Sequence, residues 1–324
     1  MPLIEINQLR VTYVSEHKRT AAVRGVTLTV NEQESVGIVG ESGSGKSTLA
    51  LAILRLLPHN TAHVEGEIRF LGNNLLELSE ERMTELRWQK LSVVFQKSMN
   101  ALSPVHKIGQ QMSDVFRIHV KDQSKQEVKE RMIQLLEMVG LPPRVYDMYP
   151  HELSGGMMQR VSIALSLMHH PKLLILDEAT TALDVITQRQ ILDELMELER
   201  QLQVTRIMIT HDIATVAYAC HKVAVMYAGQ IVEFGDVADV LREPQHPYTQ
   251  ALMRTIPAQP RETAIVRGIP GSIPDLSEPI RGCAFADRCS LARNICRNEE
   301  PPQITMPGGS QVQCHLAGGV KHAG

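Results

Sequence analysis

Residues 40–48, Gly-Glu-Ser-Gly-Ser-Gly-Lys-Ser-Thr, have the composition and spacing of a phosphate-binding loop. They fit the pattern G-x-x-x-x-G-K-[ST], in which backbone N–H groups surround nucleotide phosphates, the lysine reaches the outer phosphates and the hydroxyl after it ligates Mg²⁺. A chance glycine turn would match in roughly one chain in a hundred of this length. The residues predicted to bind nucleotide are Gly40, Glu41, Ser42, Gly43, Ser44, Gly45, Lys46, Ser47 and Thr48, with Ser47 as the magnesium ligand.

Two carboxylates, Asp177 and Glu178, directly follow the apolar stretch Leu173–Leu176. A buried strand that ends in this way places Asp177 to hold the water shell of Mg²⁺. Glu178, one residue further, is then placed to polarise the attacking water as a general base. The alternative is an acidic pair on the surface, with no role in catalysis.

Two more polar residues end strand-like segments. His211 follows Arg206–Thr210 and is predicted to hydrogen-bond a γ-phosphate, and Gln96 follows Ser92–Phe95 and is predicted to contact metal and water. Taken alone, each is weak, because a histidine or glutamine after a strand more often packs or caps. Their weight comes from the phosphate loop and the carboxylates in the same chain.

A second glycine-bearing segment opens a helix predicted from about Met157 to His169, before Pro171. Its residues are Leu153, Ser154, Gly155, Gly156 and Met157. The N-terminus of such a helix favours anions. One phosphate chain does not need two such loops from one subunit, so the pattern indicates that each subunit offers one loop to a neighbour.

The elements that must position these residues alternate between strand and helix patterns up to about residue 255, which predicts an α/β core. Residues 35–39 form a short apolar run of strand type, and 49–57 are typical of a buried helix that stops at Pro58. A helix-rich block is expected over about 97–170. Its clearest helix begins at Ser124, where Ser124 and Glu127 form a capping box.

Composition limits the class of protein. The chain has 324 residues, a net charge of −3 and no Lys/Arg block, which argues weakly against nucleic acid as the main partner. The N-terminus lacks the basic start and apolar stretch of a signal peptide, and no apolar run is long enough to span a membrane. We therefore expect a soluble intracellular protein, which at a membrane would depend on other chains to do the spanning.

The segment 256–324 differs in character, with eight of the 17 prolines and Phe285 as its one aromatic residue. It can bury little core and needs a staple or a neighbour to stay ordered. Four of the five cysteines lie in it, with the spacing Cys283-x5-Cys289-x6-Cys296-x17-Cys314. Cys220 stands apart and is most simply a small core residue.

Four intracellular cysteines in such a segment indicate a metal site before disulfides. The gaps are wider than structural zinc prefers, and an iron–sulfur cluster suits them at least as well. Cluster, zinc and no metal remain open, and His315 is a possible substitute ligand. In each metal-bound case the expected role is to staple the segment rather than to do redox chemistry.

Over about residues 3–255 the sequence resembles the ATP-binding subunits of ABC transporters. The motifs occur in the order of that family: Walker A at 40–47, the Q-loop residue Gln96, the signature at 153–157, Walker B at 173–178, the D-loop at 181–184 and the switch histidine His211. The resemblance implies that two cassettes pair head to tail and enclose each ATP between Walker A and the partner's signature. It adds Asp184 of the D-loop, and Tyr13 as the aromatic that stacks on adenine, with a tyrosine at a strand edge as the alternative.

One position departs from the family. The usual signature is LSGGQ, and Met157 replaces its glutamine. Methionine has no comparable hydrogen-bonding capacity, so any contact of that glutamine is lost, whereas the Ser154 hydroxyl and the glycine N–H groups remain. Because Glu178 and His211 are both present, we expect ATP hydrolysis.

Three stretches are similar to the oligopeptide/dipeptide/nickel branch of the family: Met99–Gln110, Pro244–Thr249 and the proline-rich tail. That branch implies a second, different ATPase chain, two membrane permease subunits and an external solute-binding protein. The residues after Gln96 would form the groove that receives a coupling helix of the permease. The cargo implied is peptide, with nickel, a metal chelate or an oligosaccharide as alternatives.

The expected architecture is a P-loop NTPase core at 1–255 that contains the helical subdomain, followed by a loop-rich cysteine tail at 256–324. The protein would lie at the cytoplasmic face of the cell membrane and use ATP and Mg²⁺. Two rivals remain. One is a soluble ABC ATPase acting on nucleic acid or ribosomes, and the other is a regulatory cassette that binds ATP without turnover.

Overall fold

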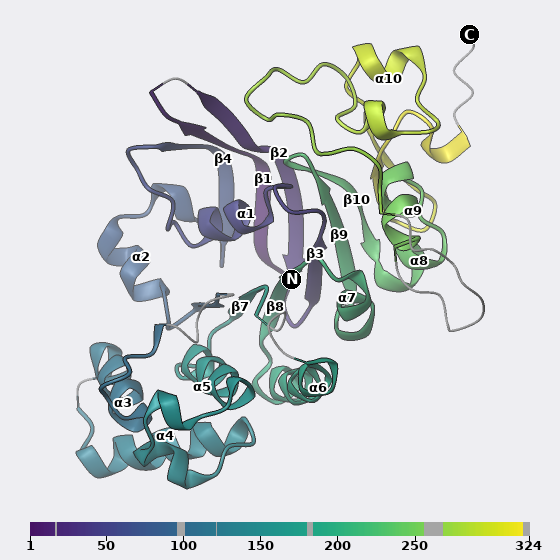
Figure 1. The fold of residues 1–324 in the computed structure, drawn as a ribbon. Helices are drawn as coiled ribbons and strands as arrows, with labels where there is room; N and C mark the ends of the chain where they lie inside the picture. Colours follow the sequence, from purple (N-terminus) through teal and green to yellow (C-terminus); the bar gives the residue numbers. More distant parts are fainter. Residues whose placement is uncertain (17, 96–100, 121, 180–183, 256–267, 320–324) are drawn as a thin grey trace. The chain divides into compact units, whose positions relative to one another are not determined.

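The computed structural model describes residues 1–324 except 17, 96–100, 121, 180–183, 256–267 and 320–324 (Figure 1). The chain divides into two compact units, each built from separate stretches of sequence. The first comprises Met1, Asn31–Glu34 and Glu77–Met208, and the second comprises Pro2–Val30, Ser35–Leu76 and Ile209–Gly324. The predicted domain boundary at residue 255 stays a prediction.

The second unit contains a four-stranded sheet with the strand order β2-β1-β4-β5 (Figure 1). Its strands are β1 (Pro2–Val14), β2 (Arg19–Asn31), β4 (Ala62–Phe70) and β5 (Asn73–Asn74). β4 runs antiparallel to both β1 and β5, and β1 shifts its register against β4 between Asn7 and Arg10.

The same unit contains a second run of strands in the order β11-β12-β10-β9-β3. β3 pairs with β9 in parallel, whereas the remaining pairs are antiparallel. These strands are β3 (Ser35–Val39), β9 (Lys222–Tyr227), β10 (Gln230–Asp236), β11 (Gln303–Thr305) and β12 (Gln311–Gln313). All five residues of β3 are buried, so the loop that follows it starts from a fixed point in the core.

Short helices complete the second unit. The α-helices are α1 (Lys46–Ile53), α7 (Ile213–Ala219), α8 (Val237–Arg242), α9 (Pro247–Met253) and α10 (Asn294–Asn298). The 3₁₀ turns are Leu75–Glu77, Ala286–Arg288 and Ala317–Gly319.

The tail shares a hydrophobic core with this unit. Phe285 packs edge-on against Tyr227 of β9 and Tyr248 of α9, with ring centroids 5.3 and 5.4 Å away, and all three side chains are buried. Aromatic pairs at these distances attract beyond the area they bury. The described part of the tail, 268–319, therefore packs against a neighbouring part of the chain, which is one of the two ways of ordering it that we predicted.

In the first unit, β6 (Leu91–Val94) pairs in parallel with β7 (Leu173–Asp177), and β8 (Thr205–Thr210) contributes its residues up to Met208. The α-helices are α2 (Glu80–Leu86), α3 (Ile108–His119), α4 (Lys125–Met138), α5 (Gly155–Leu167) and α6 (Val185–Leu202), with 3₁₀ turns at Pro143–Asp147 and Pro150–Glu152. The described part of 97–170 contains helices and no strand, and its assignment as a separate helical subdomain stays a prediction.

Local sequence signals account for some of these boundaries. Ser124 and Glu127 form the predicted capping box of α4, in which the Ser124 hydroxyl accepts from the Glu127 N–H and the Glu127 carboxylate accepts from the Ser124 N–H. α5 begins at Gly155, two residues before the predicted start, because the Ser154 hydroxyl accepts a hydrogen bond from the N–H of Met157.

The helix expected over 49–57 is wrong at both ends, since α1 spans Lys46–Ile53. Arg55 adopts a left-handed backbone (φ +51°), and its guanidinium donates to the carbonyl of Leu75 at 3.1 Å. That contact is made by a residue twenty positions further along the chain. The helix therefore ends before Pro58 is reached, and Leu56 is exposed.

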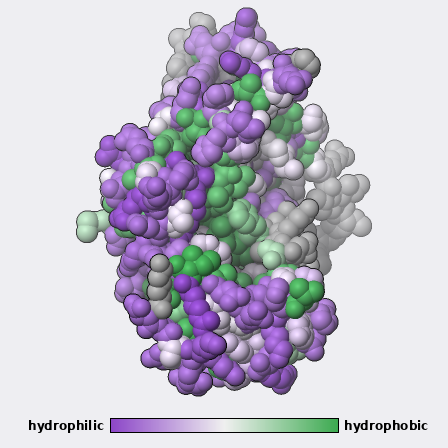
Figure 2. All heavy atoms as spheres, turned by 90° about the vertical axis from the view of Figure 1, so that its left-hand side faces the viewer, coloured by the Kyte–Doolittle hydropathy of each residue, from purple (hydrophilic) through white to green (hydrophobic). Residues whose placement is uncertain are grey.

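Hydrophilic residues cover most of the face drawn in Figure 2. Within the described residues, no helix combines the length and apolar character needed to cross a bilayer. The mixture of parallel strands, a glycine loop and helices confirms the predicted α/β class.

Candidate nucleotide-binding site

The phosphate loop connects β3 to α1 in the second unit, as predicted, and close backbone packing explains its glycines. A Cβ on Gly40 would lie 2.0 Å from the carbonyl oxygen of Met226, and a Cβ on Gly45 would lie 2.3 Å from that of Ala22. Gly45 also has φ +101°, which favours glycine. The loop thus runs directly against neighbouring backbone, where a side chain has no room.

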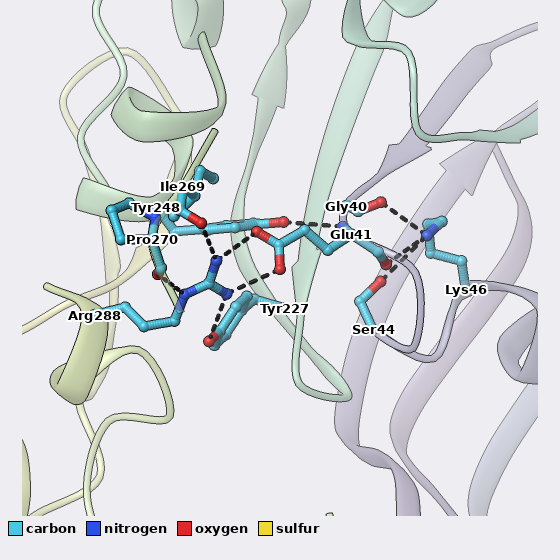
Figure 3. A network of polar contacts seen from close by, with 9 residues as sticks. All are labelled: Gly40, Glu41, Ser44, Lys46, Tyr227, Tyr248, Ile269, Pro270 and Arg288. Carbon is cyan, nitrogen blue, oxygen red and sulfur yellow. Dashed lines mark hydrogen bonds and ion pairs between the residues drawn. The ribbon is translucent and has the colours of Figure 1, made fainter. Parts of the chain in front are cut away.

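Lys46 is folded into the loop that precedes it. Its ammonium group donates to the carbonyl oxygens of Gly40 and Glu41, both at 2.8 Å, and lies 3.4 Å from the Ser44 hydroxyl (Figure 3). The residue is only 6% exposed. A positive charge is therefore held at the centre of the loop, where phosphate oxygens are expected to bind.

The start of α1 supports anion binding at the same place. Gly45 occupies the N-cap position and brings no side-chain oxygen to the amides of the first turn. The loop itself is braced by the N–H of Gly229, which donates to the carbonyl of Ser44 at 2.9 Å. A helix N-terminus opened by glycine, with a lysine beside it, attracts negative charge.

Tyr13 lies beside this loop. Its phenolic oxygen is 3.4 Å from the hydroxyl oxygen of Thr48, the last residue of the predicted nucleotide-contacting set. The structure thus brings β1 and the loop together. The stacking of Tyr13 on adenine stays a prediction.

His211 follows β8 in the second unit and is exposed. Asp212 fixes the backbone on its far side, because its N–H donates to the Thr210 hydroxyl and its carboxylate accepts from the N–H of Ala214. Asp212 is thereby the N-cap of α7. The histidine is held between a buried strand and a capped helix, which suits a residue that must reach a ligand.

The predicted carboxylates lie in the first unit, at the end of β7. Asp177 is the last residue of this wholly buried strand. Glu178 follows with φ +50°, an uncommon backbone for a residue other than glycine. Such conformations concentrate at functional sites, where the fold holds a side chain in a required direction.

The signature segment forms the N-terminus of α5 in the same unit. Leu153 is buried, Ser154 is the N-cap, and Gly155, Gly156 and Met157 form the first turn. A Cβ on Gly156 would approach the Thr187 methyl group of α6 to 2.9 Å. The hydroxyl oxygen of Ser154 accepts within the helix, while its own proton can be donated to a ligand.

Asp184 is the N-cap of α6. Its carboxylate accepts from the N–H and the hydroxyl of Thr187, at 2.9 and 2.7 Å, and these bonds lower the pKa of Asp184. The aspartate of the predicted D-loop is therefore a fixed anion. Gln96 and the D-loop residues 181–183 lie outside the described residues.

The four tail cysteines come together. Cys283, Cys289, Cys296 and Cys314 line one small cavity, together with His315. Burial, followed by the neighbouring thiols, raises the pKa of Cys283 to about 11, and burial also raises the pKa of Cys289 and Cys314. All four are free thiols.

No three His, Cys, Asp or Glu side chains among the described residues form a ready metal site. The His315 ring nitrogen Nε2 bonds the carbonyl oxygen of Glu299 at 3.0 Å. Cys220 lies outside the cavity, as predicted for a lone core residue, and packs against the hydrophobic core.

Sequence reasoning missed a contact between the tail and the phosphate loop. Arg288, which directly precedes Cys289, makes two hydrogen bonds to the Glu41 carboxylate (Figure 3). The hydroxyl of Tyr248 accepts from the Glu41 N–H at 3.0 Å. Tyr248 belongs to the segment 244–249 that suggested a family branch, but nothing in that pattern indicated a role.

Two family models match the chain. One describes the ABC transporter and matches residues 23–181, and the other describes the C-terminal region of oligopeptide/dipeptide transporters and matches residues 232–296. Together with the geometry of the phosphate loop, these matches identify the class of protein as an ABC transporter ATPase.

Among curated proteins, the chain is 44% identical to a probable peptide ABC transporter ATP-binding protein of Sinorhizobium fredii, over 96% of this chain and 94% of that protein. It is 43% identical to the oligopeptide transport ATP-binding protein OppD of Salmonella typhimurium, over 94% and 91%. It is 40% identical to the dipeptide transport ATP-binding protein DppD of Escherichia coli, over 97% of each.

Among solved structures, a dimeric ATP-binding cassette in a post-hydrolysis state with ADP and Pi matches with a TM-score of 0.64 and 28% identity, covering 72% of this chain and 98% of that chain. The cassette cbiO1 of Clostridium perfringens matches with a TM-score of 0.64 and 29% identity, covering 75% and 91%. The chain belongs to the ATP-binding proteins of ABC transporters. It is therefore an ATPase with the predicted P-loop core.

Proposed function

We propose that the chain is the ATP-hydrolysing subunit of a peptide importer. The observation that carries this proposal is the loop at residues 40–48, which holds the Lys46 ammonium among carbonyl oxygens at the N-terminus of α1. The resemblance to proteins named for peptide, oligopeptide and dipeptide transport supports peptide as the cargo.

Within the cassette, the loop N–H groups and Lys46 bind the β- and γ-phosphates, and Tyr13 contacts the adenine. Ser47 and Asp177 would each serve as ligands of Mg²⁺, directly or through its water shell, and Gln96 is proposed as a further contact of the metal. Glu178 polarises the attacking water, and His211 donates to the γ-phosphate. Positioned charges and donors of this kind supply most of the catalysis in phosphoryl transfer.

A second ATPase chain completes each site. The partner's loop equivalent to 153–157 would approach the γ-phosphate with the proton of its serine and its glycine N–H groups, while Asp184 orders the junction between subunits. ATP binding then closes the pair and hydrolysis reopens it. The dimeric cassette among the structural relatives supports such pairing.

Two permease subunits and an external binding protein complete the proposed importer. The chain would lie at the cytoplasmic face of the membrane. Its helices after Gln96 would transmit the closure of the ATPase pair to the permease as a rigid-body motion. The relatives that support these partners match nearly the whole chain, tail included.

The decisive experiment compares ATP turnover of the assembled transporter with wild-type chain, with Glu178→Gln and with Glu85→Gln. Glu85 is an exposed glutamate paired with Arg82 and serves as the matched control. Glu178→Gln should lower turnover by about 10²-fold or more and leave ATP binding intact, because only the base is lost. Equal rates for all three would remove the catalytic assignment.

We further propose that the four tail cysteines hold an iron–sulfur cluster, with zinc as the alternative metal. Four thiols that line one cavity are donors of the type that either metal group uses, although no three of them form a ready metal site among the described residues. Burial raises the pKa of Cys283, Cys289 and Cys314, which favours their protonated thiols, so binding would release protons. The group would supply a covalent staple for the tail.

Anaerobic purification, with iron, sulfide and zinc analysis and an absorption spectrum, tests this proposal. Iron and acid-labile sulfide in similar amounts, with visible absorption, would support the cluster. Zinc without colour would support the alternative. A colourless tail free of both metals would reject both.

A further inference from the structure

The phosphate-loop residue Glu41 is held by two groups from the C-terminal part of the chain. The guanidinium of Arg288 makes a two-pronged contact with its carboxylate, with Nη1–Oε2 at 2.9 Å and Nη2–Oε1 at 3.0 Å. The hydroxyl of Tyr248 accepts from its N–H at 3.0 Å. Both the side chain and the backbone of residue 41 are therefore fixed from outside the loop.

Arg288 is itself held in one orientation. Its Nε donates to the Pro270 carbonyl at 2.8 Å, Nη2 to the Ile269 carbonyl at 3.1 Å, and Nη1 to the Tyr227 hydroxyl at 3.2 Å. Its side chain is 7% exposed and lies over the rings of Tyr227 and Phe285. A planar guanidinium fixed in this way gives a carboxylate a defined direction, which a lysine cannot do.

Glu41 connects this anchor to the phosphate-binding atoms. Its carbonyl oxygen accepts from the Lys46 ammonium at 2.8 Å and from the N–H of Ser44 at 3.2 Å. A displacement of residue 41 would thus move the Lys46 ammonium and the backbone of Ser44, both in the loop proposed to bind phosphate. Figure 3 shows the continuous chain of contacts from Arg288 through Glu41 to Lys46.

We propose that Arg288 is a positioning residue for nucleotide binding: through Glu41 it holds the phosphate loop in its binding conformation. The proposal rests on the proposed function and names a residue that the loop motif does not contain. Since Arg288 lies between Phe285 and Cys289 in the 3₁₀ turn Ala286–Arg288, the order of the cysteine-bearing tail is transmitted to the nucleotide site.

The alternative role is purely structural, in which the ion pair only fastens the tail. The charge could also matter without the geometry, by cancelling the carboxylate near the phosphates. Arg288→Lys keeps the positive charge and loses the two-pronged contact. A role of the charge alone predicts unchanged affinity for this variant, whereas the positioning role predicts weaker binding.

The test is equilibrium binding of Mg²⁺-ATP to the full-length chain, with thermal unfolding measured in parallel. Arg288→Gln, Arg288→Lys and Glu41→Gln should each raise the Kd about tenfold, a typical coupling between sites. The double variant Glu41→Gln/Arg288→Gln should bind no more weakly than the worse single variant, because both act through one contact. Arg297→Gln, which removes an exposed ion pair with Asp287 in the same tail, should leave the Kd unchanged.

Tyr248→Phe provides a second test if an Arg288 or Glu41 variant fails to fold. It removes one hydroxyl from a buried ring and should also weaken ATP binding, through the backbone of residue 41. In the assembled transporter, Arg288→Gln should raise the KM for ATP with kcat within about twofold of wild type.

Wild-type affinity in Arg288→Lys or Arg288→Gln, or single effects that multiply in the double variant, would overturn the proposal. A lower melting temperature with an unchanged Kd would likewise show a structural role only. Failure of the wild-type chain to bind ATP would instead count against the proposed function itself.

Discussion

His246 Nδ1 accepts a hydrogen bond from the backbone N–H of Tyr248 at 3.0 Å, and this contact caps the N-terminus of α9. The ring nitrogen can accept only while it is unprotonated. The imidazole is buried, and burial lowers the pKa of His246 to about 3. The helix that presents Tyr248 to the phosphate loop therefore depends on a neutral histidine.

A pH dependence follows from this shift. The unfolded chain protonates His246 near its ordinary value of 6.5, whereas the folded chain does so only near pH 3. Between these values the unfolded state binds the extra proton, so the free energy of unfolding falls by about 1.4 kcal/mol for each unit of pH lost. Above pH 6.5 the residue contributes no slope.

His246→Asn keeps a capping acceptor and removes the titration. Urea unfolding at several values between pH 7.5 and 4.5 should give a shallower pH dependence for this variant than for wild type. Exposed His59→Asn serves as the control for loss of an imidazole. Parallel curves for wild type and His246→Asn would contradict the assignment.

Ser154 and Ser124 form a matched pair of helix caps with different expected functions. Each hydroxyl accepts from the N–H three residues on, at 3.3 and 3.2 Å. Alanine at either position should lower the free energy of unfolding by about 1 kcal/mol. Only Ser154→Ala should lower ATP turnover of the assembled transporter, by about tenfold, because only Ser154 is proposed to face a phosphate. Equal turnover in the two variants would exclude that role.

Gly45 and Gly72 separate steric contact from backbone strain. Both have positive φ, but a Cβ on Gly45 would lie 2.3 Å from the Ala22 carbonyl, whereas a Cβ on Gly72 meets nothing within 4 Å. Gly72→Ala should cost about 1 kcal/mol of stability and leave ATP binding unchanged. Gly45→Ala should cost more and abolish ATP binding. Retained binding in Gly45→Ala would show that the loop tolerates displacement.

The cysteine proposal predicts a contrast between tail and core. Cys289→Ser should remove the bound metal and lower the thermal unfolding temperature, because one of four ligands is lost. Cys220→Ser, away from the cavity, should keep full metal content. Identical metal content in both variants would place the metal elsewhere.

The sequence was most informative where the determining contacts are local. The capping box of α4 joins residues three positions apart, so its start was predictable. The end of α1 was not predictable, because Arg55 hydrogen-bonds the carbonyl oxygen of Leu75, which lies far along the chain. The class of protein was predicted correctly because the nucleotide motifs occur in the order typical of the family. The roles of the individual residues remain proposals.

The contact between Glu41 and Arg288 shows the limit of such reasoning. The two residues are separated by 247 positions, and neither has a neighbour whose type or spacing points to the other. The tail cysteines were recognisable as a set from composition. Their shared cavity, with His246 and Phe285 on its wall, required the fold.

The internal contacts of Lys46 affect the cost of bringing its charge to a phosphate. Its ammonium is buried and bonded to two carbonyl oxygens of its own loop. Because the ammonium is buried by the fold, most of the cost of stripping water from the lysine is incurred when the chain folds rather than when phosphate binds. Affinity for ATP should accordingly depend on where the Gly40 and Glu41 carbonyls hold the lysine, more than on the lysine's charge alone.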